Sequence, residues 1–322
     1  MTLKQSLAGA VAFLALASAA GAADMQPVLK APGAVEQQAT GYVEIYGGWA
    51  GTRESLSSIE GRDLSERVPG WALGGAGRAN YWIAREVSVQ VDAQAEGTSY
   101  EFSGGGGSTH SYLVGGHWSW RSPQQYLFGL FAAAGDAGGI GFTGSDQRHG
   151  LIGAEAQWYW DQFTLYAQGG YDTTLGTLHS PANGIFTDSI NAWFIRGTGR
   201  YFVNPNLLIE GTVMYANGRL DFNFGDPSLG FQTWSWQAKA EWRFPTAPFS
   251  VFAKYQGSQT RYGSSEFENI TSAKVTDHRV LLGLKLHMGD RTLQQTDRTG
   301  ATLDIVSPLA NATSPVMFDP FN

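Results

Sequence analysis

Hydrophobic and polar residues alternate along residues 233–244 of this chain. Every second residue from Trp234 to Phe244 is apolar, whereas the residues between them, from Thr233 to Arg243, are polar or charged. Successive side chains of a β-strand point to opposite faces, so the segment predicts a strand with one apolar and one polar face. Such a strand fits a soluble sheet with a core, or a membrane barrel whose apolar face meets lipid. Whether the pattern recurs along the chain decides between the soluble sheet and the membrane barrel.

The alternation recurs from residue 41 to residue 288. It predicts about twelve strands, with eight or ten as alternatives, and an even number is typical of bacterial barrels. Residues 126–135 are apolar on both faces and fit the pattern least well. The predicted strands are residues 41–51, 70–82, 87–97, 112–121, 126–135, 150–160, 163–172, 191–203, 207–215, 233–244, 249–258 and 278–288.

The predicted connections alternate between short and long. Residues 83–86, 121–125, 204–206 and 245–248 and the segment around Asp161 are tight turns, whereas residues 52–69, 98–109, 136–149, 173–189, 217–230 and 257–277 are long and polar. Short periplasmic turns and longer outer loops are typical of outer-membrane barrels, and a soluble β-sandwich does not predict them. The sequence therefore predicts an all-β fold, a transmembrane antiparallel up-and-down β-barrel over residues 41–289. Because the first connection is long, both termini are expected in the periplasm.

The segments outside the barrel follow from the ends of the chain. Lys4, an apolar run over residues 7–16 and the Ala20-Gly21-Ala22 cleavage motif predict a removed signal peptide at residues 1–22. Residues 23–40 are expected to form a periplasmic lead-in, and residues 290–322 an extended periplasmic tail. No stretch reaches 18 uninterrupted apolar residues, so no helical span is expected. We therefore expect the protein in the cell outer membrane.

Composition agrees with this interpretation. The 322 residues include 42 Gly and 13% aromatic residues, but only 15% charged residues and no cysteine. An exported chain without cysteine is not stabilised by disulfides. The net charge of −7 argues against nucleic acid as a partner. The expected partners are outer-membrane lipid and lipopolysaccharide, with small polar solutes in the lumen.

The start of the mature chain resembles a known family. Residues 22–32, Ala-Ala-Asp-Met-Gln-Pro-Val-Leu-Lys-Ala-Pro, are similar to the N-terminus of porin-like outer-membrane β-barrel proteins of alphaproteobacteria such as the rhizobia. The resemblance implies export and a barrel, although many members of that family look eight-stranded. The Gly283-x-x-Leu286-x-Met288 spacing resembles part of the signal read by the barrel-assembly machinery, which is thus an expected partner. Leu281 departs from it, because a polar residue is usual there.

Enzymatic motifs give little support for catalysis. Gly139, Gly141 and Gly144 match GxGxxG but cap a predicted hairpin, where a dinucleotide site would need a following helix. A lipid hydrolase is the less favoured alternative, since there is no GxSxG motif, and His117 and Ser119 share a face about 7 Å apart. The six histidines show no metal-ligand spacing. We predict no catalytic, cofactor-binding or metal site.

The charged residues on the polar faces are the candidate functional residues. Acidic positions dominate the first seven strands and basic positions the last five, so the two groups would face each other across a closed lumen. The acidic positions are Glu44, Asp92, Glu96, Glu155, Asp172, Glu210 and Glu241, and the basic positions are Arg78, Arg196, Arg200, Lys239, Arg243, Lys254, Arg279 and Lys285. An open lumen predicts a narrow porin-like channel for passive diffusion of small hydrophilic solutes. If the charges pair and close the lumen, the sequence predicts a structural or surface-interaction barrel that acts through its outer loops.

Overall fold

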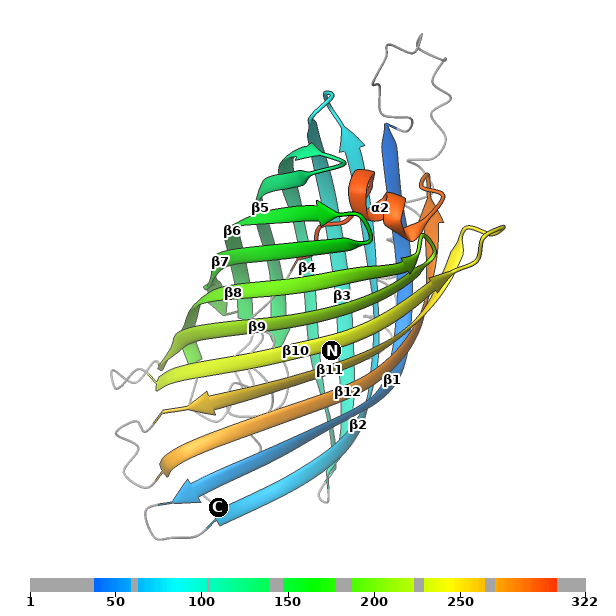
Figure 1. Ribbon diagram of the computed structural model, residues 1–322. Coiled ribbons are helices and arrows are strands. Elements are labelled where there is room, and N and C mark those ends of the chain that lie inside the picture. Colours follow the sequence, from blue (N-terminus) through cyan, green and yellow to red (C-terminus); the bar gives the residue numbers. More distant parts are fainter. Residues whose placement is uncertain are drawn as a thin grey trace.

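Twelve antiparallel strands form a closed barrel in the computed structural model (Figure 1). The structure describes residues 38–58, 63–102, 105–138, 147–177, 187–222, 229–263 and 270–305. Each strand pairs with its neighbours in sequence, and β1 pairs with β12 to close the barrel. The strands are β1 Ala39–Ser58, β2 Asp63–Trp82, β3 Val87–Phe102, β4 Gly105–Ser122, β5 Tyr126–Gly138, β6 Gln147–Trp160, β7 Phe163–Thr177, β8 Thr187–Asn204, β9 Leu207–Phe222, β10 Leu229–Arg243, β11 Phe249–Tyr262 and β12 Ile270–Met288. The predicted fold is confirmed.

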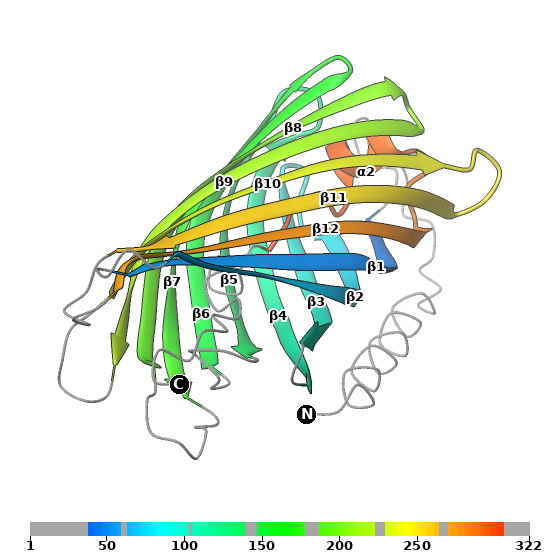
Figure 2. The ribbon, with the colours of Figure 1, turned by 90° about the horizontal axis from the view of Figure 1, so that it is seen from below.

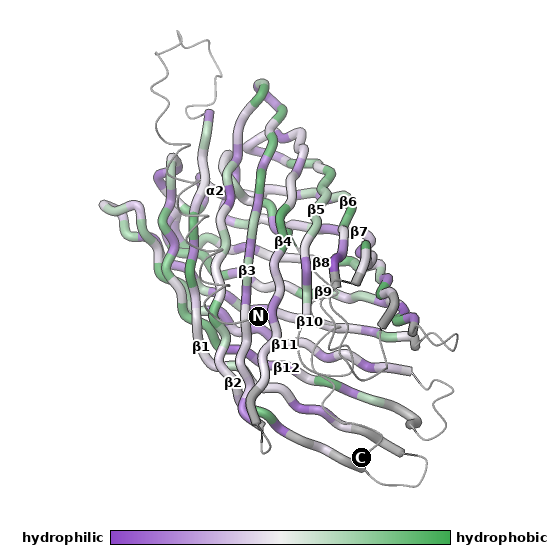
Figure 3. The backbone as a smooth tube through the Cα atoms, turned by 180° about the vertical axis from the view of Figure 1, so that it is seen from behind, coloured by the Kyte–Doolittle hydropathy of each residue, from purple (hydrophilic) through white to green (hydrophobic). Residues whose placement is uncertain are grey.

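The two faces of each strand have opposite chemistry, and hydropathy alternates along the chain (Figure 3). Outward side chains are apolar and exposed, for example Trp71 at 67%, Ile152 at 67% and Leu282 at 65%. Inward side chains are largely polar and buried, such as Gln157 and Thr164 at 0%. Since hydrocarbon cannot satisfy backbone polar groups, strands in a membrane must close into a barrel. The apolar outer surface thus requires the closure that β1 and β12 provide.

The strands are longer than the alternation predicts. β1 and β2 stay paired to Ser57 and Asp63, inside the segment 52–69 that the sequence analysis assigned to a loop. A backbone ladder continues wherever both chains stay extended, whereas the apolar half of the pattern is needed only where the strand contacts lipid. The tight turns lie where they were predicted, and Asp161 has φ 44° in the two-residue turn between β6 and β7. Aspartate tolerates this left-handed conformation better than most residues do.

Large rings inside the barrel lie over glycines of the neighbouring strand. Tyr46 of β1 is paired with Gly74 of β2, and a Cβ on Gly74 would lie 2.6 Å from the Tyr46 ring. Leu281, which departs from the assembly signal, faces inward and packs with Tyr46 and Phe252. Glycine therefore provides the space that lets a narrow barrel hold aromatic side chains.

Residues 290–305, here called the plug segment, enter the barrel. The segment begins with α2, Leu293–Thr299, whose N-cap Thr292 accepts a 3.0 Å hydrogen bond from the Gln295 amide. α2 lies at the end of the barrel that carries the tight turns (Figures 1 and 2), and residues 301–305 continue into the lumen without regular secondary structure. Among the described residues, no helix is long and apolar enough to cross a membrane.

The sequence predicts an extended periplasmic tail over residues 290–322, whereas residues 290–305 enter the barrel. The segment has no hydrophobic period because its partners are individual side chains of the wall, as described below. The predicted signal peptide, residues 1–22, and most of the lead-in lie outside the described residues, as do Gly139 to Gly144 and residues 306–322.

Candidate functional site: the charged lumen

The plug segment packs its apolar side chains on one half of the barrel wall. Leu303 is fully buried against Leu127, Tyr159 and Tyr166. Ile305 joins a separate apolar cluster, made of Leu113, Phe131, Leu151, Phe194, Met214 and Ala216. Full burial of a leucine or isoleucine contributes about 1.5–3 kcal/mol. The inner face of β5 is apolar because it receives these two residues, which explains why residues 126–135 are apolar on both faces.

Wall side chains also bind the backbone of the plug segment. The Gln90 side chain of β3 accepts from the Leu303 amide at 3.2 Å and donates to the Leu303 carbonyl at 2.8 Å. Gln168 of β7 donates to the Asp304 carbonyl at 2.7 Å, and the Asp304 amide donates to the Tyr166 hydroxyl at 3.2 Å. Buried backbone groups need such partners. The two glutamine side chains thus supply hydrogen bonds of the kind that a neighbouring strand supplies in a sheet.

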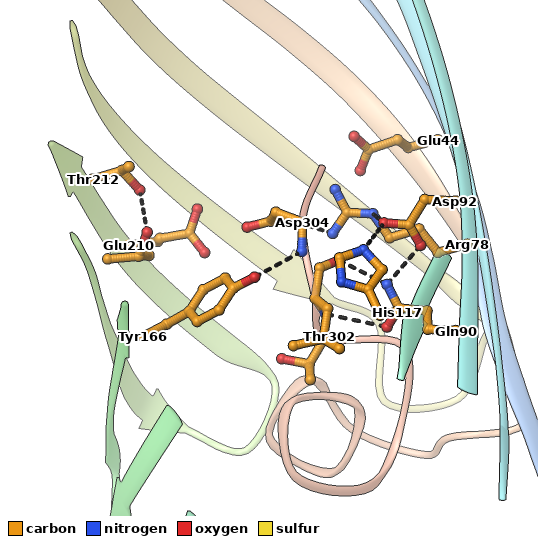
Figure 4. Close-up of polar contacts among 12 residues, drawn as sticks. Glu44, Arg78, Gln90, Asp92, His117, Tyr166, Glu210, Thr212, Thr302 and Asp304 are labelled. Carbon is orange, nitrogen blue, oxygen red and sulfur yellow. Dashed lines mark hydrogen bonds and ion pairs between the residues drawn. The ribbon is translucent and has the colours of Figure 1, made fainter. Parts of the chain in front are cut away.

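The Asp304 carboxylate lies between arginines from opposite walls of the barrel. Its Oδ1 pairs with Arg78 of β2, and its Oδ2 pairs with Arg196 at 3.1 Å and Arg200 at 3.3 Å, both from β8. Figure 4 shows Asp304 with Arg78 and Asp92 on one side and Tyr166 on the other. The strand order places β2 and β8 six positions apart in a ring of twelve. One carboxylate therefore bridges the full width of the lumen.

Arg200 connects the plug segment to the wall through several bonds. Its Nε donates to Glu210 at 2.9 Å, while Nη1 donates to Asp297 at 2.8 Å and to the Thr302 hydroxyl at 2.7 Å. Charge-assisted bonds of this kind are the stronger hydrogen bonds in proteins. Between Asp297 and Thr302, the Gly300 carbonyl accepts a hydrogen bond from Arg121 at 2.9 Å.

The charged positions predicted for the lumen lie on the inner wall, and most are paired. Lys285 pairs with Glu44 at 3.2 Å and with Glu241 at 3.0 Å. Lys239 lies 3.6 Å from Glu210 and 3.3 Å from Glu241. The other contacts are Arg78 with Asp92 at 3.8 Å, Glu155 with His117 at 2.8 Å, Asp172 with His149 at 2.9 Å, Arg279 with Glu96, and Arg243 with the Asp290 carbonyl. Acidic and basic side chains of the predicted walls thus lie next to one another in ion pairs.

Lys254 differs from the other lumen cations. Within the described residues it has no carboxylate at salt-bridge distance, and its ammonium lies 3.8 Å from the centre of the Tyr46 ring. It borders a polar cavity of about 320 Å³ that the plug segment leaves between itself and the rest of the wall. Lys239, Lys285, Arg279 and Glu44 also line this cavity. The plug segment thus packs on the wall along β4–β7, and the cavity extends along β1–β3 and β8–β12.

Two histidines form buried clusters in the wall. His117 lies 3.2 Å from Asp92 and 2.8 Å from Glu155 and ties three strands together. Nε2 of His287 lies 2.9 Å from the Ser250 hydroxyl and 3.6 Å from Glu241. A hydrolytic triad needs the serine and the acid on different ring nitrogens. In this second cluster both contacts fall on one nitrogen, and Ser250 is fully buried.

Sequence reasoning missed the residues that organise the lumen. Asp297 and Asp304 lie in a segment that was assigned to an extended tail, and Gln90 and Gln168 are uncharged and so were not candidates. The apolar inner face of residues 126–135 was the one available signal, because an inward apolar surface in a polar lumen needs an apolar partner.

Solved structures that resemble this chain include outer-membrane proteins. An outer membrane channel from Pseudomonas putida F1 aligns with a TM-score of 0.52 and 12% identity, over 81% of this chain and 100% of that chain. The translocator domain of the autotransporter NalP from Neisseria meningitidis has a TM-score of 0.46 and 8% identity, over 88% and 97% of the two chains. The TodX monoaromatic hydrocarbon channel deltaS2 mutant has a TM-score of 0.41 and 8% identity, over 81% and 92%.

The comparison with the channel from Pseudomonas putida F1 supports the fold. At 12% identity, the likeness to the channel from Pseudomonas putida F1 shows a common barrel architecture of the outer-membrane type. No protein-family model matches the chain, and no curated protein matches it in sequence. Function must therefore be argued from the lumen itself.

Proposed function

We propose that this protein is an outer-membrane channel for small hydrophilic solutes and that the plug segment closes it in the state described here. The observation that carries the proposal is the charged cavity of about 320 Å³ beside the plug segment. Polar groups and charges that face a water-filled space fix which solutes pass a pore.

The distribution of charge supports a solute path over a purely structural interior. Buried ion pairs add little stability, because desolvation offsets much of their attraction, and apolar side chains fill a core as well or better. The wall along β4 and β5 shows that this barrel can build such an apolar interior, with Leu113, Leu127 and Phe131. The wall along β10–β12 instead carries Lys239, Lys254 and Lys285, which a solute path explains.

A closed barrel that acts through its outer loops is the second candidate. The close packing of Leu303 and Ile305 favours it, because a plug that never leaves would make the lumen a permanent interior. The two candidates differ in whether residues 290–305 leave the wall. Solute flux through the full-length protein separates them.

Flux assays in proteoliposomes test the proposal. Ile305→Asp places a charge in the apolar cluster and should release the plug segment, while Ile305→Leu keeps the volume and should leave it docked. We expect slow efflux of small sugars and organic acids from vesicles with wild-type protein or Ile305→Leu, and fast efflux with Ile305→Asp. Absence of efflux in all three, with the barrel folded, would exclude the channel and favour the closed barrel.

A further inference from the structure

The contacts of Asp304 suggest a ligand site inside the lumen. We propose that Arg78, Arg196 and Arg200 form a binding site for small organic carboxylates, which the Asp304 side chain occupies as an internal ligand while the lumen is closed. The inference deepens the proposed function and rests on it for its biological meaning, since it names the class of solute and what controls access. The binding site itself can be tested without a membrane.

The chemistry of the three arginines fits a carboxylate. Guanidinium groups present planar sets of N–H donors that match the two oxygens of a carboxylate. Asp304 uses both oxygens, Oδ1 toward Arg78 and Oδ2 toward Arg196 and Arg200 at 3.1 and 3.3 Å. The side chain of Asp304 is thus an example of the ligand that the site would bind. A solute carboxylate in the same place would make the same contacts.

Departure of Asp304 leaves an excess of positive charge at this site. Within the described residues, Asp304 is the one carboxylate at salt-bridge distance from Arg196, whose other bond goes to the neutral Gln168 at 2.8 Å. Arg78 would keep Asp92 at 3.8 Å, and Arg200 would keep Glu210 at 2.9 Å. Arg196 then has no anionic partner among the described residues, so a solute carboxylate can take the place of Asp304.

A cavity adjoins the three arginines in the closed structure. The cavity of about 320 Å³ is lined by Asp304 and the three arginines and also by Lys239, Lys254 and Lys285. Lys254 lacks a carboxylate partner among the described residues and contacts the Tyr46 ring instead. The lining also holds acidic residues, among them Glu44, Glu210 and Glu241, so a cation without a carboxylate partner, such as Lys254, is the group that attracts an anion into the cavity. The volume suits molecules at the lower end of ordinary ligand sites, which span about 300–1,000 Å³.

The remaining acids limit the charge of the ligand. Glu210 stays paired with Arg200 at 2.9 Å and Asp92 stays 3.8 Å from Arg78 when the plug segment leaves, so part of the positive charge is already balanced. A ligand with one or two carboxylates matches the cations that remain, namely Arg196, part of Arg78 and Lys254. The site is therefore assigned to mono- and dicarboxylates.

Isothermal titration of the folded, full-length protein with succinate tests the assignment. Asp304→Asn removes the internal charge with little change of volume, and Glu96→Gln is the matched control, because it removes a lumen carboxylate paired with Arg279 outside the arginine cluster. We expect Asp304→Asn to bind succinate at least about tenfold more tightly than wild type, a difference of about 1.4 kcal/mol, with Glu96→Gln unchanged. Adding Arg196→Gln should abolish the gain, and uncharged succinamide should not bind any variant. Equal affinity of wild type and Asp304→Asn, or a gain that survives Arg196→Gln, would overturn the proposal.

A second measurement keeps Asp304 in place. The chain has no cysteine, so Ala301→Cys introduces a single thiol at a position that is 1% exposed in the docked plug segment. If succinate competes with Asp304, it should speed maleimide labelling of this thiol in proportion to its concentration, whereas succinamide should not. No acceleration by succinate would count against the internal-ligand assignment. Neither measurement involves flux, so binding without flux would refute the channel alone, and flux without binding would refute the carboxylate site alone.

Discussion

Replacing Leu303 by alanine removes a fully buried side chain that docks the plug segment on the barrel wall. Leu303 is 0% exposed and packs against Leu127, Tyr159 and Tyr166, which come from three different strands. Those strands are held by their own ladders, so the wall cannot collapse into the space left behind. Leucine-to-alanine changes at such sites cost about 2–5 kcal/mol. Here the cost falls on docking of the plug segment, because the twelve-strand ladder does not depend on it.

Thiol labelling measures this cost directly. In an Ala301→Cys background, the labelling rate depends on the fraction of molecules whose plug segment has left the wall. At about 1.4 kcal/mol per tenfold change in an equilibrium constant, Leu303→Ala should speed labelling by about 30-fold to several thousandfold, up to the rate of a free thiol. Leu282→Ala, which removes the same atoms from the outer face at 65% exposure, is the matched control and should leave the rate unchanged. An unchanged rate in Leu303→Ala would refute the docking argument.

Three further predictions test the outer face, the helix and the inner wall. Ala238→Lys puts a charge on the lipid face and should lower the stability of the barrel in lipid vesicles by about 2–4 kcal/mol in urea titrations, whereas Gln237→Lys on the inner face should cost less. Burial raises the pKa of Asp290 from 3.8 to about 6, so the folded state holds this proton more tightly than the unfolded state does. Docking of the plug segment should therefore weaken as pH rises from about 4 through about 6. Amide protection of α2, corrected for intrinsic exchange, should fall over that range in wild type and stay level in Asp290→Asn. Gly74→Ala should cost about 1–3 kcal/mol in denaturant melts because its Cβ would meet the Tyr46 ring, and most of that cost should vanish in a Tyr46→Ala background.

The faces of the strands could be predicted from sequence because lipid and a polar interior impose opposite requirements on alternate residues. Trp234 and Leu282 are outward and exposed, while Lys239 and Lys285 are inward, as the alternation predicts. Loop lengths were overestimated, because strand pairing needs only backbone groups and continues where the outer side chains no longer have to be apolar. β1 and β2 therefore extend far beyond the apolar belt.

The site could be predicted only in part. Alternation assigns Arg196 and Arg200 to the lumen but does not say what neutralises them. Their partners include Asp304, more than a hundred residues away in a segment without periodicity. That segment docks through single residues into separate places on the wall, and such contacts leave no repeating signal in a sequence. The apolar inner face of β5 was the sequence feature that indicated these contacts.

Single-channel recording of full-length protein in planar bilayers tests whether residues 290–305 close a conducting lumen. We predict that wild-type molecules stay closed for long periods with brief openings. Leu303→Ala should raise the open fraction, and the increase in the ratio of open to closed time should match the increase in thiol labelling. If the labelling shows that the plug segment leaves while no current passes, the lumen is not a channel and the proposed function is wrong.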